Sequence, residues 1–245
     1  MSIASDSSAD SIIAVAANFA PTAVVLAEDF ERRGGGRVEI ISGASGSLYA
    51  QIVAGAPFSA FLSADTCRPL ALAGRAPALA ATQATYALGR LVLYSPSQPL
   101  RLDGAGWPLL RDQDRIALAN PRVAPYGAAA VAVLEQLPNG DRLTRVQTSN
   151  VAQAFAVITA GHVAAGFVAA AQVPRDAVES TVWPVPTDAH PPIYQDAILT
   201  PVGESDPTAK AFLSYLMSEA AQALLLEAGF AVPADADAGR AVPCS

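Results

Sequence analysis

Short runs of consecutive apolar residues alternate along the chain with segments in which apolar residues recur every three or four positions. The first pattern is typical of buried strands and the second of amphipathic helices. Strands are expected at residues 12–16, 38–41, 58–63, 86–94, 116–119, 165–170, 182–185 and 193–200. Helices are expected at residues 22–33, 48–54, 66–73, 127–137, 151–160 and 208–228. This alternation predicts an α/β architecture with mostly parallel sheets flanked by helices.

The last expected helix has the clearest end signals. Asp206 suits its N-cap, Pro207 its first turn, and Gly229 the position just after its end. We therefore expect one continuous helix over residues 208–228.

Two apolar runs indicate how the chain is divided. The pattern changes near residues 86–94, and residues 193–200 form a second run of the same kind. Two crossings of this kind predict a discontinuous first lobe, an inserted second lobe and a two-stranded hinge, with a ligand cleft between the lobes. The expected bounds are residues 12–87 plus 199–232 for the first lobe, 88–198 for the second, and 1–11 and 233–245 for flexible tails.

Composition narrows the possible partners. The formal net charge is −7, only 15% of residues are charged, and no basic run is present, which argues against nucleic acid and anionic membranes. No apolar run reaches membrane-spanning length. Residues 1–11 are polar with no basic region, which fits either a cytoplasmic protein or a mature secreted one. Cys67 and Cys244 are too few for a metal cluster, and whether they pair is left open.

Four junctions between an expected strand and an expected helix share one chemistry: each is rich in backbone and side-chain donors and carries no charge. They are Ala16-Ala17-Asn18-Phe19, Gly43-Ala44-Ser45-Gly46-Ser47, Ala124-Pro125-Tyr126-Gly127 and Thr148-Ser149-Asn150-Val151. The start of a helix offers free N–H groups and about half a positive charge, which suits an anion. Such junctions lie at the carboxyl edge of a parallel sheet, where ligands bind.

Helix capping is the competing explanation for each junction taken singly, because Asn, Ser and Thr commonly cap helices. The convergence of the four junctions favours a ligand site over helix capping. Two junctions fall in each expected lobe, so closure of the lobes would bring all four onto one ligand. Four helix starts together can balance a dianion without a lysine or arginine.

A hydrolase is the main alternative from a different class. Residues 43–47 nearly match a nucleophile elbow around Ser45, but Ser47 stands where the last glycine should be. The chain has only His162 and His190 to act as a base, and both are expected on the surface. No catalytic residue is therefore assigned, and no metal-ligand spacing is present.

Taken together, several stretches resemble the periplasmic molybdate-binding proteins that serve ABC importers. The resemblance extends over about residues 12–232. The carrying stretches are the first, second and third junctions above, Leu48-Tyr49-Ala50-Gln51-Ile52, Gly55-Ala56-Pro57-Phe58-Ser59-Ala60-Phe61-Leu62-Ser63-Ala64-Asp65, Asn120-Pro121-Arg122-Val123, Ser149-Asn150-Val151, Ala165-Gly166-Phe167-Val168-Ala169 and Glu227-Ala228-Gly229-Phe230.

The resemblance implies a type II periplasmic-binding-protein fold, with an oxyanion held between two lobes. It implies ligand contacts from Asn18 (side chain or N–H), Ala17, the hydroxyl and N–H of Ser45, and the N–H groups of Tyr126 and Val151. It further implies a periplasmic protein that works with a membrane permease, without a cofactor, and we expect a monomer. In some members a tyrosine hydroxyl stands within the segment that is here residues 167–170, and a serine stands at position 18.

The junctions also bear on which oxyanion binds. They supply donors and no acidic side chain, whereas a partly protonated phosphate presents an O–H that needs an acceptor. Molybdate or tungstate is therefore expected, with sulfate as the alternative. A hydrolase using Ser45 and the ligand-sensing half of a transcription regulator remain as less favoured alternatives.

Overall fold

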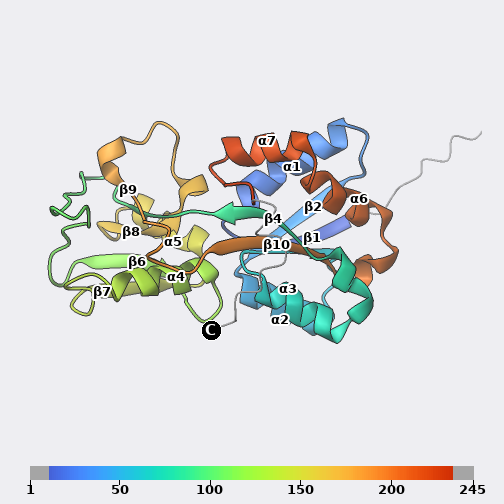
Figure 1. The fold of residues 1–245 in the computed structure, drawn as a ribbon, viewed down its shortest axis with the longest axis horizontal. Helices are drawn as coiled ribbons and strands as arrows, with labels where there is room; N and C mark the ends of the chain where they lie inside the picture. The colour runs from blue at the N-terminus through green and yellow to red at the C-terminus, as the bar shows by residue number, and fades with distance from the viewer. Residues whose placement is uncertain (1–10, 234–245) are drawn as a thin grey trace, which may run out of the picture.

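Two five-stranded sheets, each flanked by helices, form the two lobes of the molecule (Figure 1). The computed structural model describes residues 11–233. The α/β class, the two lobes and the flanking helices are as the sequence predicts. The sheets are mixed and not mostly parallel, because the strands at residues 91–94 and 193–199 run antiparallel to both of their neighbours.

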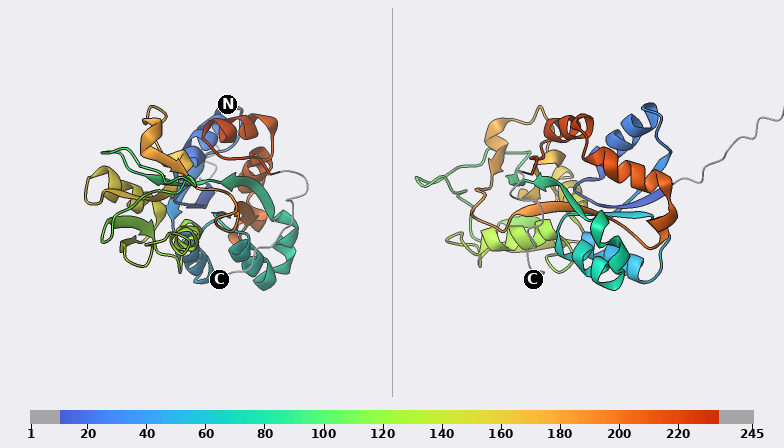
Figure 2. Two further views of the ribbon diagram at one scale, coloured as in Figure 1. Left: turned by 60° about the vertical axis from the view of Figure 1, so that its left-hand side comes forward. Right: turned by 45° about the vertical axis from the view of Figure 1, so that its right-hand side comes forward.

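The first sheet has the strand order β2-β1-β3-β10-β4. Its strands are β1 (Ser11–Ala16), β2 (Val38–Gly43), β3 (Ala60–Ser63), β4 (Ala84–Gly89) and β10 (Ile193–Leu199). β1 is parallel to both of its neighbours, whereas β10 is antiparallel to β3 and β4. Helices α1 (Ala20–Arg32), α6 (Pro207–Leu216) and α7 (Glu219–Glu227) lie on one face, and α2 (Ser45–Val53) and α3 (Cys67–Arg75) on the other (Figures 1 and 2).

The second sheet has the order β7-β6-β8-β5-β9. Its strands are β5 (Leu91–Tyr94), β6 (Arg115–Ala119), β7 (Thr144–Thr148), β8 (Ala165–Ala169) and β9 (Val182–Pro184). β6 is parallel to β7 and β8, and α4 (Pro125–Leu134) and α5 (Val151–Thr159) follow β6 and β7. Short 3₁₀ turns lie at η1 (Pro77–Thr82), η2 (Ala170–Gln172), η3 (Glu179–Thr181) and η4 (Val202–Ser205).

The chain crosses between the sheets twice. It passes from β4 to β5 through Arg90, and from β9 to β10 through residues 185–192. Within the first sheet, β10 pairs with β4 from Ile193 opposite Gly89 onward. The expected second lobe, residues 88–198, would include β10. The pairing instead puts this strand in the first sheet, so the second crossing lies before Ile193.

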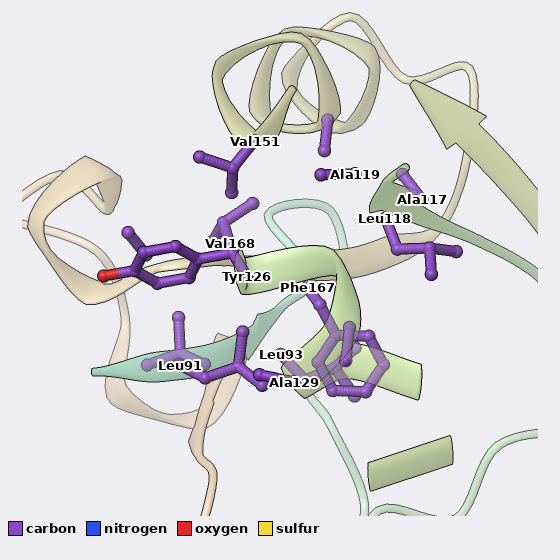
Figure 3. Packing of buried hydrophobic residues seen from close by; sticks show 14 of the residues in the cluster. Leu91, Leu93, Ala117, Leu118, Ala119, Tyr126, Ala129, Val151, Phe167 and Val168 are labelled. Carbon is purple, nitrogen blue, oxygen red and sulfur yellow. The ribbon is translucent and has the colours of Figure 1, made fainter. Parts of the chain in front are cut away.

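Each lobe has its own apolar core. In the first, Phe19 packs against Tyr86 and Phe230, with ring centroids 4.9 and 5.2 Å apart. In the second, the apolar residues of β5, β6 and β8 are buried together with Tyr126, in the first turn of α4, and Val151, the first residue of α5 (Figure 3). Full burial of one large apolar side chain contributes about 1.5–3 kcal/mol. Both helix starts are thus held by the core of their lobe.

Several expected elements differ in the structure. The helix expected over 208–228 is two helices. Ser218 is the N-cap of the second one, because its hydroxyl accepts a hydrogen bond from the Ala221 N–H at 3.3 Å. The run at 86–94 is divided between two strands at Arg90, and β7 was not expected because Thr144–Thr148 is mostly polar and partly exposed. Ser11, expected in a tail, is buried at the start of β1; the rest of both expected tails, apart from Pro233, lies outside the described residues.

Asp206 caps α6 as expected. Its carboxylate accepts hydrogen bonds from the Ala209 N–H at 3.0 Å and from the Ser11 hydroxyl at 2.7 Å. Gly229 follows α7 with a φ of 90°, a conformation that favours glycine at a helix end. Over the described residues, no helix is both long and apolar enough to cross a bilayer.

Candidate functional site

A small space lies between the two lobes, where the four donor-rich junctions meet. The volume open to the centre of a water-sized sphere is about 10 Å³. All five residues expected at the ligand line it. The complete lining is Ala16, Ala17, Asn18, Gly43, Ala44, Ser45, Ala64, Ala124, Pro125, Tyr126, Asn150 and Val151.

The topology explains this convergence. In the first lobe, β1 leads to α1 and β2 leads to α2; in the second, β6 leads to α4 and β7 leads to α5. β1 is parallel to β2, and β6 is parallel to β7, so the carboxyl ends of each pair share one edge of a sheet. The two edges face each other across the cavity, and each lobe contributes two helix starts.

Helix capping accounts for only one of the four junctions. Asn150 caps α5 by accepting a hydrogen bond from the Gln153 N–H at 3.0 Å. The N-cap residues of α1, α2 and α4 are Phe19, Ala44 and Ala124, and none of them makes a side-chain cap. Ser45 follows the N-cap of α2, so its hydroxyl serves another purpose.

Six main-chain donors at the cavity are unused. Among the described residues that line it, the N–H groups without a hydrogen-bond acceptor are those of Asn18, Ala44, Ser45, Tyr126, Asn150 and Val151. Ala17 differs, because its N–H donates to the carbonyl oxygen of Gly43 at 2.9 Å. Ala17 therefore lines the cavity as a wall, with no donor to spare. A buried N–H without an acceptor is costly, so six around one space favour an acceptor there.

The hydroxyl of Ser45 is oriented by its neighbour. Ser45 is buried, and its Oγ accepts a hydrogen bond from the Ala64 N–H at 3.0 Å. A hydroxyl that accepts in this way still has its own hydrogen to donate. The side chain is therefore available as a further donor.

The Asn18 side chain is committed to the protein. Its Nδ2 donates to Gln195 Oε1 at 3.1 Å and lies 3.5 Å from the Tyr126 hydroxyl oxygen in the other lobe. Both amide hydrogens are thus directed at protein acceptors, which leaves the N–H of Asn18 as the donor for a ligand. Gln195 was not among the residues expected at the site. The available signal was a buried polar residue within the apolar strand β10.

Tyr126 is a neutral phenol in this setting. Burial raises the pKa of its hydroxyl well above the ordinary value, and the hydrogen bond from Asn18 offsets this only in part. Its ring packs in the core of the second lobe (Figure 3). The hydroxyl of Tyr126 is held by Asn18 and its ring by the core, and together they keep its main-chain N–H at the cavity.

The lobes are in direct contact beside the cavity. The Gly46 N–H donates to the carbonyl oxygen of Val123 at 2.8 Å. A Cβ atom at Gly46 would lie 3.0 Å from Val123 Cα, so the two backbones approach as closely as glycine permits. The structure is therefore a closed state.

The cavity wall carries no charge. None of the lining residues is Asp, Glu, Lys, Arg or His. The positive potential comes from the starts of α2, α4 and α5 and from the turn before α1. Donors without a carboxylate suit a fully deprotonated anion.

Nucleophilic catalysis and metal binding find no support here. His162 is exposed, His190 Nδ1 lies 2.8 Å from the carbonyl oxygen of Pro191, and neither residue lines the cavity of Ser45. Within residues 11–233, no group of three or more His, Cys, Asp or Glu side chains is placed to hold a metal ion.

Comparison with known proteins agrees with this geometry. Residues 12–231 match the family model described as bacterial extracellular solute-binding protein. The chain is 39% identical over 221 residues to the molybdate-binding protein ModA of Rhodobacter capsulatus, covering 89% of this chain and 87% of the relative. It is 37% identical over 223 residues to ModA of Azotobacter vinelandii, covering 89% and 88%. The solved Azotobacter vinelandii periplasmic molybdate-binding protein superimposes with a TM-score of 0.82 at 35% identity, covering 92% of this chain and 100% of that one.

Proposed function

The chain belongs to the family of bacterial extracellular solute-binding proteins, and from that premise we propose that it binds molybdate between its lobes and delivers it to the permease of an ABC importer. Tungstate is included, because it is the same kind of tetrahedral dianion. The protein is a transport component and not an enzyme, and it needs no cofactor.

One observation carries the proposal: six unpaired N–H groups, three from each lobe, surround a single cavity with uncharged walls. We propose that the N–H groups of Asn18, Ser45, Tyr126 and Val151 and the hydroxyl of Ser45 donate to the oxygens of the anion. Ala17 donates no hydrogen bond to the anion and contributes only to the cavity wall. Hydrogen bonds to a charged acceptor contribute about 1.5–3 kcal/mol each, so the set is sufficient for tight binding.

Closure of the lobes is the proposed mechanism of capture. Asn18 and Ser45 belong to the first lobe, and Tyr126 and Val151 to the second. The full donor set exists only when the lobes are together, so the ligand favours the closed state by its additional contacts there.

Localisation and assembly follow from the same premise. A protein of this family works outside the cytoplasmic membrane, and we propose that this one is periplasmic. We further propose that it acts as a monomer without nucleic acid as a partner, in keeping with its net charge of −7.

A thermal-shift titration tests the proposal. Purified protein is heated with molybdate, tungstate, sulfate or phosphate. Ligand at 100 times its dissociation constant should add about 2.7 kcal/mol of stability. Molybdate and tungstate should raise the melting temperature, and phosphate should not, since the cavity lacks a carboxylate to accept from its O–H. A shift with sulfate alone would show that the ligand is sulfate and not molybdate. The absence of a shift with every one of these oxyanions would overturn the proposal.

A further inference from the structure

The hydroxyl of Tyr126 reaches out of its own lobe and lies against a strand of the other lobe. Tyr126 belongs to α4 in the second lobe, and its hydroxyl points away from the other labelled residues of that core (Figure 3). A Cβ atom at Gly89 of β4 would lie only 2.1 Å from the hydroxyl oxygen, whereas real Cβ atoms do not come closer than 3.0 Å to such neighbours. The hydroxyl therefore takes the place that a side chain at position 89 would need.

Gly89 stands where the chain crosses between the lobes. It is the last residue of β4, and the chain passes to β5 of the second lobe through Arg90, the next residue. The backbone at Gly89 is not in the left-handed region that favours glycine. The missing side chain is thus needed for the approach of Tyr126, and not for the conformation of the chain.

Gln195 forms another wall of the same space, and it comes from β10, the strand that follows the second crossing. Ile193 pairs with Gly89, and Gln195 lies two positions later, so its side chain is on the same face of the sheet as Gly89. Gln195 is fully buried, and its Nε2 lies 2.9 Å from the Cβ position of Gly89. This Nε2 has no hydrogen-bond partner among the described residues. A buried amide nitrogen without an acceptor is costly, which indicates that Gln195 has a role besides stability.

Three residues of the first lobe thus surround one hydroxyl of the second lobe. Gln195 Oε1 accepts a hydrogen bond from Asn18 Nδ2 at 3.1 Å, and this Nδ2 lies 3.5 Å from the Tyr126 hydroxyl oxygen. We call Asn18, Gly89 and Gln195 the hinge socket. Tyr126 moves with the second lobe and the hinge socket with the first, so separation of the lobes withdraws the hydroxyl from the socket.

We propose that Gly89 and Gln195 are positioning residues for anion binding, because the hinge socket accepts the Tyr126 hydroxyl only when the lobes are closed. This inference rests on the proposed function. Asn18 and Tyr126 each contribute a main-chain N–H to the anion cavity, so the fit of the hydroxyl in the socket aligns one donor of each lobe. Closure therefore depends on a fit at the hinge as well as on the donors around the anion.

A double-variant comparison tests the fit at Gly89. The affinity for molybdate is measured by isothermal titration calorimetry in the wild type, Gly89→Ala, Tyr126→Phe and the double variant. Overpacking of this contact should weaken binding to Gly89→Ala by about 10- to 100-fold. Without the hydroxyl, the nearest remaining atoms lie 2.9 Å from the new Cβ, so the same substitution should cost less when it is made in Tyr126→Phe. An equal cost in the two backgrounds, or no cost in either, would overturn the proposal.

A second comparison tests Gln195. Gln195→Met keeps the length of the side chain but cannot accept from Asn18, and it should weaken molybdate binding by about three- to tenfold. Gln222→Met in α7 is the matched control, because Gln222 also has an unpaired amide atom and donates to the carbonyl oxygens of Tyr86 and Leu216, away from the anion cavity. The control should lower the melting temperature of the ligand-free protein and leave the affinity unchanged. Equal affinities of Gln195→Met and the wild type would overturn the role of Gln195.

These outcomes are distinct from a failure of the proposed function. The wild type is titrated with molybdate first, and the ligand-free melting temperature of each variant shows whether it is folded. If the wild type does not bind molybdate, the proposed function fails and the inference fails with it. If the wild type binds molybdate and the variants bind it equally well, only the inference fails. The comparison at Gln195 decides independently if Gly89→Ala does not fold.

Discussion

The N–H of Gly46 donates to the carbonyl oxygen of Val123 at 2.8 Å, which joins the start of α2 in the first lobe to the loop before α4 in the second. Both residues lie next to proposed ligand contacts, because Ser45 precedes Gly46 and Tyr126 follows Val123 by three positions. The hydrogen bond that joins the lobes and the proposed anion site are thus built from the same two junctions.

Gly46→Ala should weaken molybdate binding at least tenfold. The new Cβ would lie 3.0–3.1 Å from Val123 backbone and side-chain atoms, so the lobes would have to stay slightly apart. The affinity is measured by isothermal titration calorimetry. Alanine also favours helix by up to about 1 kcal/mol over glycine, so the first lobe should not be destabilised. Gly74→Ala in α3 is the control, since its Cβ would meet open space. Equal affinities for the two variants would contradict the prediction.

Ser45→Ala should weaken molybdate binding by about 1.5–3 kcal/mol, the contribution of a hydrogen bond to a charged group. This corresponds to a dissociation constant about 10- to 150-fold higher. Ser47→Ala is the matched control, because Ser47 is on the same turn of α2 but is exposed and outside the cavity. Unchanged affinity in Ser45→Ala would remove its hydroxyl from the site.

Tyr126→Phe should have a smaller effect on binding. The variant keeps the main-chain N–H proposed to contact the anion and loses only the hydroxyl, which lies 3.5 Å from Asn18 Nδ2. A weak neutral hydrogen bond contributes no more than about 0.5–1.5 kcal/mol, so the dissociation constant should rise by about tenfold at most. A loss above 100-fold would mean that the phenol, and not the N–H, contacts the anion.

Asp206→Ala should destabilise the protein by about 0.5–2 kcal/mol, the contribution of an N-cap. Asp206→Asn keeps a capping oxygen and should cost less. Denaturant unfolding at several pH values measures both.

The pH dependence at Asp206 has a defined sign. Desolvation raises the pKa of Asp206, but hydrogen bonds from the Ala209 N–H and the Ser11 hydroxyl outweigh it, so the pKa is lowered from its ordinary 3.8. The carboxylate therefore contributes stability above pH 3.8, and this is lost as the pH falls through the lowered pKa. The wild type and Asp206→Asn should differ most above pH 4 and converge in acid. A constant difference would contradict the prediction.

Much of the fold and the cavity lining was predictable because both rest on local patterns. Apolar runs mark the buried strands, and the parallel α/β rule brings the starts of the helices to one edge of each sheet. Ser45 and Val151 could be identified from their position alone. Whether they contact the anion is still a prediction.

The remaining features depend on contacts between distant residues. The hydrogen bond from the Ala17 N–H to the Gly43 carbonyl oxygen depends on the register of β1 against β2. The hydrogen bond from Asn18 to Gln195 joins residues 177 positions apart. Neither leaves a periodic signal in the sequence.

The uncharged cavity wall has a consequence for release. No group that lines it titrates near neutral pH, so a change of pH cannot expel the anion by altering the protein around it. Salt also has little to screen, because the attraction comes from short-range dipoles. Release of the anion is therefore expected to depend on separation of the two lobes, which takes away the donors of one of them, and not on the pH or the salt concentration of the solution.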